Sequence, residues 1–229
     1  MTEAKKLTID IYSDVMCPWC IIGYAQLQKG LAQLEGEIEA EVRWLPFELN
    51  PDMPPEGEES VAHIARKYGR TVEQAKAGRD QMLGVGERAG YSFAYTGEGE
   101  PPPSMLRNTF AAHKLLKWAL IEGGAAVQNR LKLALFDAHF QQRRDVSDAD
   151  VLVELATAQG LDPVGARAAL SDAALGAIVK REEAQAYDMN ITGVPAMIIQ
   201  GKYMIPGAQE PEVYVNALRR VVEREARAA

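Results

Sequence analysis

The sequence predicts an α/β protein whose sheet-forming segments lie at the two ends of the chain, with a large all-helical insertion between them. Three observations lead to this class. Strand patterns flank a helical pattern in residues 7–47, and strand patterns return only after residue 194. The long stretch between them carries helical patterns and helix-start signals.

The N-terminal segments predict a β-α-β unit. Residues 7–12 alternate apolar and polar side chains, as a half-buried strand does. Ser13 and Asp14 follow and are expected to cap a helix over residues 18–34, whose first residue is a proline suited to the first turn. Residues 39–47 form the next strand pattern. A strand, a helix and a strand in such close succession predict a parallel pair with a right-handed crossover.

Helix-start signals mark the central block. Thr71–Gln74 matches a capping box, Ser147–Asp150 matches a second one, and Asp162–Pro163 pairs a cap residue with proline. Between residues 104 and 144 two long helices are expected, separated at Gly123–Gly124.

The C-terminal segments predict two strands and a final helix. Residues 195–199 and 203–205 have strand character on either side of a glycine turn. An amphipathic helix over residues 211–224 follows, with Val213 and Leu218 among the residues expected to face inward.

Composition and termini narrow the function classes. The chain has 229 residues and a formal net charge of −7, with no run of five basic residues. Nucleic-acid binding requires clustered Lys and Arg, so no nucleic-acid partner is expected. The N-terminal segment has no apolar core of a signal peptide, and no stretch reaches the ~18 apolar residues of a membrane helix. We therefore expect a cytoplasmic protein that does not enter a membrane.

The chain contains only two cysteines, Cys17 and Cys20, at the junction of the first strand and helix. Random placement gives this spacing roughly one time in a hundred. At a helix N-terminus the free N–H groups favour a thiolate, so Cys17 is expected to be the low-pKa nucleophile and Cys20 the resolving cysteine. A zinc site is disfavoured because His63, His113 and His139 show no paired ligand spacing, so no metal is expected. An inert buried pair is the remaining alternative.

Several motifs resemble those of one family. The segment Ser13–Cys20, which reads SDVMCPWC, and Gly193–Pro195 before the last two strands resemble the DsbA-like thioredoxin superfamily, with the FrnE-type cytoplasmic oxidoreductases as the nearest branch. Pro46–Pro51, Asn108–Thr109 and Gly207–Gln209 add to the resemblance, which spans nearly the whole chain.

The resemblance implies a thioredoxin-like fold split by the helical insertion. Residues 1–57 would form its N-terminal βαβ half, residues 58–190 the helical insertion domain, and residues 191–229 its C-terminal ββα half. It also implies that Val194–Pro195 is the cis-proline loop lying against the CxxC motif, where the backbone of Val194 can pair with an extended substrate chain.

The resemblance further implies which residues bind substrate: Pro18, Trp19, Val194, Pro195, Asn50 and Asn108. For the two asparagines, a turn or helix-cap role is the stronger alternative. His113 lies on an apolar helix and is expected to be a core histidine rather than a catalytic base.

The function that follows is thiol–disulfide exchange with protein or small-molecule thiols and disulfides. No tightly bound cofactor is expected, and glutathione or another low-molecular-weight thiol is the expected co-substrate. The related kappa-class glutathione transferases and 2-hydroxychromene-2-carboxylate isomerases carry a serine in the motif, so two cysteines favour exchange. A glutathione-dependent isomerase or transferase, and a chaperone-like peptide-binding module, stay open as alternatives, as does an oligomeric assembly. Trp19 replaces the histidine of periplasmic relatives, which predicts a less oxidising pair.

Overall fold

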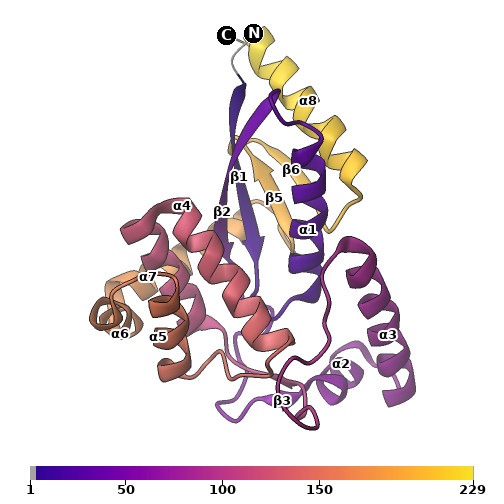
Figure 1. Cartoon of the computed structure of the whole chain (residues 1–229), viewed down its shortest axis with the longest axis vertical. Coiled ribbons are helices and arrows are strands. Elements are labelled where there is room, and N and C mark those ends of the chain that lie inside the picture. The colour runs from indigo at the N-terminus through magenta and orange to yellow at the C-terminus, as the bar shows by residue number, and fades with distance from the viewer. Residues whose placement is uncertain (1–3, 229) are drawn as a thin grey trace.

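The computed structural model describes residues 4–228 and contains a four-stranded sheet at its centre (Figure 1). Its strands lie in the order β2-β1-β5-β6. Their bounds are β1 Lys5–Ser13, β2 Ile38–Pro46, β5 Ala196–Ile199 and β6 Tyr203–Pro206. β1 pairs in parallel with β2 and antiparallel with β5, which in turn pairs antiparallel with β6. The strands from the two ends of the chain therefore form one sheet, which confirms the predicted split.

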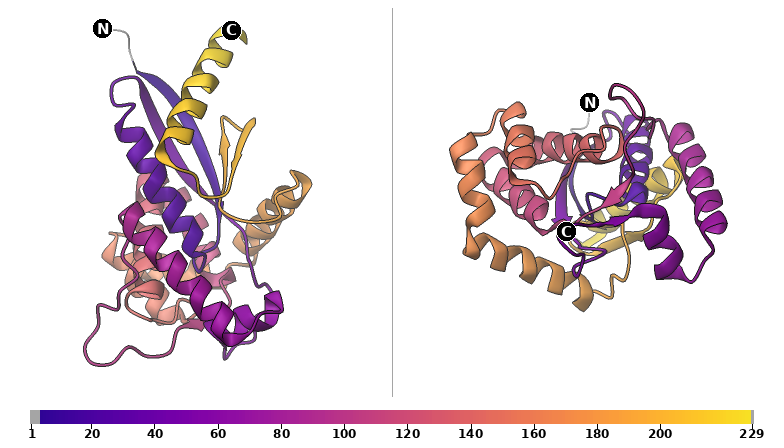
Figure 2. Two further views of the ribbon diagram at one scale, coloured as in Figure 1. Left: turned by 90° about the vertical axis from the view of Figure 1, so that its right-hand side faces the viewer. Right: turned by 90° about the horizontal axis from the view of Figure 1, so that it is seen from below.

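Two helices pack together on one face of this sheet (Figure 2). They are α1 Pro18–Ala32 and α8 Pro211–Ala228. A Cβ on Gly30 of α1 would lie 3.1 Å from the Pro211 carbonyl oxygen, so the close approach of the two helices depends on glycine. α8 buries Leu218, as predicted, but Val213 is 44% exposed. The prediction for Val213 is wrong because the neighbouring Tyr214 takes the inward position and is fully buried.

The insertion between β2 and β5 contains six helices within the described residues. These are α2 Ser60–Tyr68, α3 Val72–Ala89, α4 Phe110–Phe140, α5 Ala149–Ala158, α6 Pro163–Ser171 and α7 Ala173–Asp188. The insertion is not entirely helical, because β3 Glu58–Glu59 and β4 Met105–Leu106 form a short antiparallel ladder. Seen from below, the inserted segments surround the lower end of the sheet (Figure 2). The domain boundaries at residues 57 and 190 stay predictions.

Most of the predicted helix signals are confirmed. Thr71 and Gln74 form the capping box of α3, and Asp162 caps α6 through a hydrogen bond from the Gly165 N–H. Gly124 breaks the helical conformation inside α4, with φ 74° and ψ −177°. Only glycine adopts this backbone conformation readily, and it divides α4 into the two expected halves.

The second capping-box prediction is wrong. The cap of α5 is Asp148, whose carboxylate accepts from the N–H groups of Asp150 and Val151. The Ser147 hydroxyl instead donates to Asp145 at 2.5 Å. A carboxylate one residue later outcompetes the serine because it accepts two backbone N–H groups and carries the charge that a helix N-terminus favours.

The C-terminal half of α4 docks against the edge strand β2. Gln128 is fully buried and its Oε1 accepts from the Trp44 N–H at 2.9 Å, while its Nε2 donates to the Trp44 carbonyl at 2.8 Å. One turn on, Lys132 lies above the Trp44 ring, and Phe136 contacts the same ring at a centroid distance of 5.9 Å. Spacing by four residues places these three side chains on one face of α4, facing the sheet.

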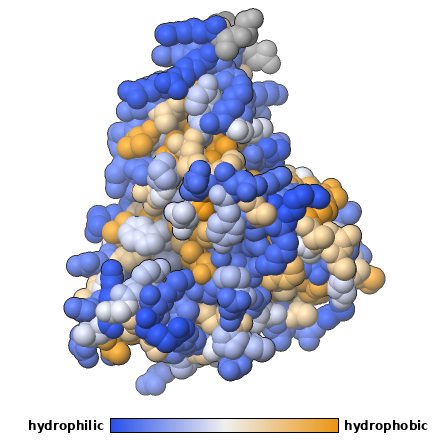
Figure 3. Space-filling model, turned by 180° about the vertical axis from the view of Figure 1, so that it is seen from behind, coloured by the Kyte–Doolittle hydropathy of each residue, from blue (hydrophilic) through white to orange (hydrophobic). Residues whose placement is uncertain are grey.

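The face seen in Figure 3 is hydrophilic over much of its area, with apolar patches at its centre and on its right-hand side. None of the helices within residues 4–228 combines the length and apolar character of a membrane span.

Candidate active site at the start of helix α1

The two cysteines lie at the turn from β1 to α1, at the end of the sheet where the insertion begins (Figure 1). Cys17 is the N-cap residue of α1, with φ −86° and ψ 111°, and Pro18 is the first helical residue. The Cys20 N–H donates to the Cys17 carbonyl at 3.1 Å, so both cysteines belong to the first turn. Both thiols are free, with 4% of Cys17 and 0% of Cys20 exposed. Only Cys17 offers any surface to a partner.

The loop before β5 lies directly against Cys17. The Cys17 thiol donates to the Val194 carbonyl at 3.5 Å, and the Val194–Pro195 peptide bond is cis. Gly23 allows this loop to approach α1, since a Cβ there would lie 3.1 Å from the Pro195 Cγ. Among residues 4–228, no group accepts a hydrogen bond from the Val194 N–H. The loop thus presents an unused backbone donor beside the cysteine.

Two features, one on α1 and one at the Val194–Pro195 loop, can receive a ligand. Trp19, between the cysteines, is 43% exposed and forms an aromatic surface, while Pro18 is half-buried. A pocket of about 360 Å³ is lined by the loop residues 190–196 and by Met204, Pro206 and Gly207 at the end of β6. This groups four of the predicted substrate-binding residues, Pro18, Trp19, Val194 and Pro195, around Cys17.

Asp14 does not cap α1, which corrects the expectation from sequence. Its carboxylate accepts from the Met16 N–H at 3.1 Å and from the Leu49 N–H at 2.7 Å. Asp14 thereby ties the turn before the cysteines to the loop after β2. Burial raises the pKa of its carboxyl, although these two hydrogen bonds and the charge of Lys132 oppose the shift.

The two thiols interact and share their titration. Hydrogen bonding with Cys20, burial and the Asp14 charge raise the pKa of the Cys17 thiol. Burial works against ionisation of Cys20 too, but the neighbouring side chains of Cys17 and Ser13 and the charge of Lys132 lower its pKa. Lys132 therefore adds a positive field on the buried side of the pair, in addition to that of the α1 N-terminus. The nucleophilic role of Cys17 and the resolving role of Cys20 stay predictions.

Sequence reasoning missed Lys132 altogether. This lysine of α4 is fully buried, and its Nζ has no hydrogen-bond partner among residues 4–228. Nζ lies 5.2 Å from the ring centroid of Trp44 and 4.8 Å from that of Phe136. Burial lowers its pKa to about 8, and the charges of Cys20, Asp14 and Cys17 oppose that shift. One signal in the sequence could have indicated it: Lys132 lies four residues after Gln128 and four before Phe136, on a face of a long helix whose other side chains point inward.

Asn50 and Asn108 both lie in the loops around Asp14, but protein groups occupy their amides. The Asn50 Oδ1 lies 2.8 Å from the Lys67 Nζ and 3.0 Å from the His63 Nε2. The Asn108 Oδ1 accepts from the Phe110 N–H at 3.0 Å, near the start of α4. These contacts fit the structural alternative, and substrate binding by either residue stays a prediction.

His113 is buried, and its Nε2 has no partner among the described residues. Burial, with the charges of Lys132 and Lys180, lowers its pKa well below the ordinary histidine value. The imidazole is therefore neutral near neutral pH, and it belongs to the core of the insertion.

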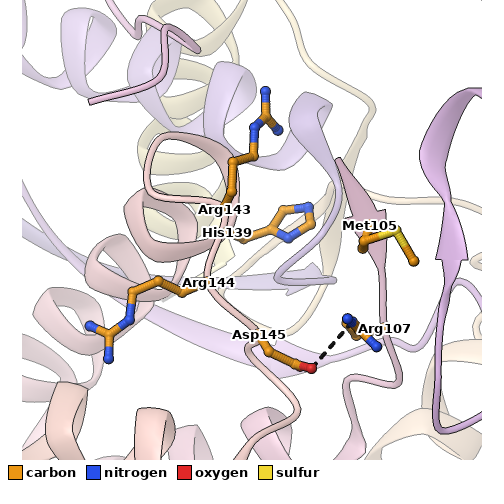
Figure 4. Close-up of a pocket in the computed structure, with 6 residues that line it drawn as sticks. All are labelled: Met105, Arg107, His139, Arg143, Arg144 and Asp145. Carbon is orange, nitrogen blue, oxygen red and sulfur yellow. Dashed lines mark ion pairs between the residues drawn. The ribbon is translucent and has the colours of Figure 1, made fainter. Parts of the chain in front are cut away.

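A second, smaller pocket of about 50 Å³ lies between β4 and the segment after α4 (Figure 4). Its lining includes three arginines, two of which are paired: Arg107 with Asp145 at 3.2 Å, and Arg144 with Glu154 at 2.6 Å. The backbone N–H of Arg107 also donates to the Met16 sulfur, with 3.0 Å between N and S, which connects this region to the residue before Cys17.

Comparison with known proteins agrees with this geometry. Residues 8–219 match the family model of the DSBA-like thioredoxin domain. The protein YwbO of Bacillus subtilis (strain 168), described as uncharacterized, is 28% identical over 211 residues, covering 92% of this chain and 94% of YwbO.

Two solved structures are similar over most of their length. A probable DsbA oxidoreductase from Streptomyces coelicolor, SCO1869, shares 33% identity with a TM-score of 0.83, covering 93% of this chain and 89% of that one. The cytosolic disulfide reductase DsbM from Pseudomonas aeruginosa, solved with GSH, shares 16% identity with a TM-score of 0.63, covering 94% and 99%. At this lower identity, DsbM shows the common fold alone.

Proposed function

The chain belongs to the DsbA-like thioredoxin family, and from this premise we propose that it is a thiol–disulfide oxidoreductase acting through Cys17 and Cys20. The observation that carries the proposal is the pair of free thiols in the first turn of α1, with Cys17 facing the Val194 carbonyl. A sulfur at this position has both a partner cysteine and a backbone surface for a substrate.

The reaction consists of two thiol–disulfide exchanges. The Cys17 thiolate attacks one sulfur of a substrate disulfide, and the other substrate sulfur leaves as a thiolate. Cys17 loses its proton for this step, and because the two thiols share their titration, Cys20 is the group that takes it up. Cys20 then attacks the Cys17 sulfur and releases the second substrate thiolate. The substrate gains two electrons, and the protein keeps a Cys17–Cys20 disulfide.

The surroundings of Cys17 support an extended or small thiol substrate. The free Val194 N–H suits main-chain pairing with a peptide, and the exposed Trp19 ring and the pocket beside the Val194–Pro195 loop suit apolar side chains. Glutathione or another low-molecular-weight thiol is the proposed co-substrate, with no tightly bound cofactor. We place the protein in the cytoplasm, where free thiols persist, as the name of the cytosolic reductase DsbM also favours.

Turnover and trapping test this function. Wild-type protein should reduce insulin disulfides or glutathione disulfide when a thiol reductant is supplied, and Cys17→Ser should abolish the activity. Cys20→Ser should stop turnover and accumulate mixed disulfides through Cys17, visible by mass spectrometry. No turnover in the wild type would contradict the proposal.

The same Cys20→Ser variant separates the alternatives. A glutathione-dependent isomerase or transferase needs only one positioned thiol and would retain its activity in this variant. A peptide-binding module would suppress aggregation of an unfolded client without either cysteine.

A further inference from the structure

Lys132 occupies a position where a charge is costly. It is fully buried, its Nζ makes no hydrogen bond to the described residues, and its immediate neighbours include the rings of Trp44 and Phe136. Cation–π contacts with two rings compensate only part of the hydration that an ammonium loses. A methionine would fill the same space without that cost. Packing alone therefore does not account for a lysine here.

Groups at the turn from β1 to α1 supply negative charge that acts on Lys132. The negative groups that act on it are Cys20, Asp14 and Cys17. Cys20 belongs to the same buried cluster as Trp44 and Phe136, the two rings that Nζ overlies. Of these three residues, Cys20 is the least exposed, with no accessible surface.

The remaining titratable groups near the pair do not supply this charge. His113, on the same helix as Lys132, is neutral because its pKa lies well below the ordinary value, burial being the main cause. Tyr214 of α8 feels the Cys20 charge, but burial raises its pKa to about 12, so it stays protonated. Asp14 carries a charge of the wrong sign. Lys132 is thus the cation that acts on the buried sulfur.

We propose that Lys132 stabilises negative charge on the Cys20 sulfur, in the dithiol and in the mixed disulfide, and so favours both the resolving step and the reduced form of the pair. The proposal rests on the function proposed above and assigns a positioning role, because Lys132 acts through Cys20.

The charge moves during the resolving step. The Cys20 thiolate forms a bond to the Cys17 sulfur, the bond from Cys17 to the substrate sulfur breaks, and that sulfur leaves with the electron pair as a thiolate. The substrate disulfide is the oxidant. Once Cys20 is in a disulfide, Lys132 retains only Asp14 as a counter-charge, so its proton is held less tightly. By linkage, whatever stabilises the thiolate also stabilises the reduced protein.

The test compares Lys132→Met with Lys114→Met. Lys114 also lies on α4 and is 7% exposed, but it donates to the Leu170 carbonyl at 2.7 Å, away from the cysteines. Removing a cation beside a thiolate raises the thiol pKa by roughly one unit or more. In Lys132→Met the ultraviolet absorbance of the thiolate should therefore titrate at higher pH, with about tenfold less thiolate at any pH below the transition.

Two reaction readouts accompany this titration. An aromatic disulfide reagent releases one coloured thiolate when Cys17 attacks and a second when Cys20 resolves. Lys132→Met should slow the second phase by about tenfold, and shift the equilibrium with glutathione about tenfold toward the protein disulfide, which is roughly 30 mV. Lys114→Met should stay within about twofold of wild type in both, since its charge lies away from the pair.

The outcomes separate this inference from the proposed function. If the wild type releases only one coloured thiolate and forms no Cys17–Cys20 disulfide, the oxidoreductase assignment fails. If the wild type releases both and Lys132→Met matches it in titration, second phase and equilibrium, Lys132 is a packing residue and the inference fails. Should Lys132→Met not fold, nuclear magnetic resonance of isotope-labelled lysine in the wild type decides. The pKa of Lys132 should be lower in the disulfide form than in the dithiol, and equal values overturn the proposal.

Discussion

Replacing Gln128 with leucine tests how the insertion is attached to the sheet. β2 is an edge strand, and the Gln128 amide takes the place of a neighbouring strand at Trp44 by pairing with both its N–H and its carbonyl. In Gln128→Leu these two buried backbone groups lose their partners while the apolar volume is kept. The change therefore removes hydrogen bonds without creating a large cavity.

The expected cost follows from those two groups. Each unsatisfied buried backbone group costs about 1–3 kcal/mol, so the free energy of unfolding should fall by about 2–6 kcal/mol. Total stability is typically about 5–15 kcal/mol, so the effect is large. Urea titration followed by circular dichroism and tryptophan fluorescence measures it.

An exposed glutamine supplies the matched control. Gln185→Leu on α7 changes the same side chain on the surface and should stay within about 0.5 kcal/mol of wild type. A loss below about 0.5 kcal/mol for Gln128→Leu, with an unchanged denaturant slope, would refute the reasoning.

Three further predictions follow from buried groups and close contacts. Burial, aided by Arg143, lowers the pKa of His139 to about 3, so between pH 6.5 and 3 the unfolded chain binds a proton that the native state does not. The free energy of unfolding measured by urea titration should therefore fall by about 2 kcal/mol between pH 7 and pH 5 because of His139, and His139→Phe should remove that loss. If the pH dependence of stability is the same in His139→Phe and wild type, this account is wrong. Gly23→Ala should destabilise the protein by about 1–3 kcal/mol, because the new Cβ would lie 3.1 Å from the Pro195 ring. Gly78→Ala, where the nearest atom lies at 3.5 Å, should instead stabilise it by about 0.5–1 kcal/mol. Equal effects of the two substitutions in thermal unfolding would contradict this. Asp14→Asn should lower the pKa of the catalytic thiol pair and speed alkylation at pH 7 by up to about tenfold, and slower alkylation would oppose the electrostatic account.

Local patterns predicted the fold well because each is decided by neighbouring residues. The alternation in residues 7–12, the cap at Thr71 and the break at Gly124 each depend on the chemistry of a few adjacent positions. The errors arose where two local candidates competed. Asp148 displaced Ser147 as a cap, and Tyr214 displaced Val213 in the core, because charge and apolar area decided between neighbours.

The candidate site was predictable only in its sequence-local part. The spacing of Cys17 and Cys20 identified them as a candidate pair, and the Val194–Pro195 loop was identified by resemblance to a family. Lys132 was not identified, because it lies more than a hundred residues away along the chain. It is brought toward the cysteines by the docking of α4 on β2. Long-range contacts of this kind leave no spacing signature in a single sequence.

The hydrogen bond from the Cys17 thiol to the Val194 carbonyl makes the Val194–Pro195 loop, the proposed substrate contact, sensitive to the oxidation state of the protein. A cysteine in a disulfide has no hydrogen to donate, so the oxidised protein frees this carbonyl, while the adjacent N–H is free in the dithiol structure described. An extended chain can then form one backbone hydrogen bond more with the oxidised protein than with the reduced one. A difference of about 0.5–1.5 kcal/mol corresponds to a change in affinity of about twofold to tenfold. The dithiol and disulfide forms would then differ in their affinity for extended chains through main-chain hydrogen bonds, as well as in the state of their sulfurs.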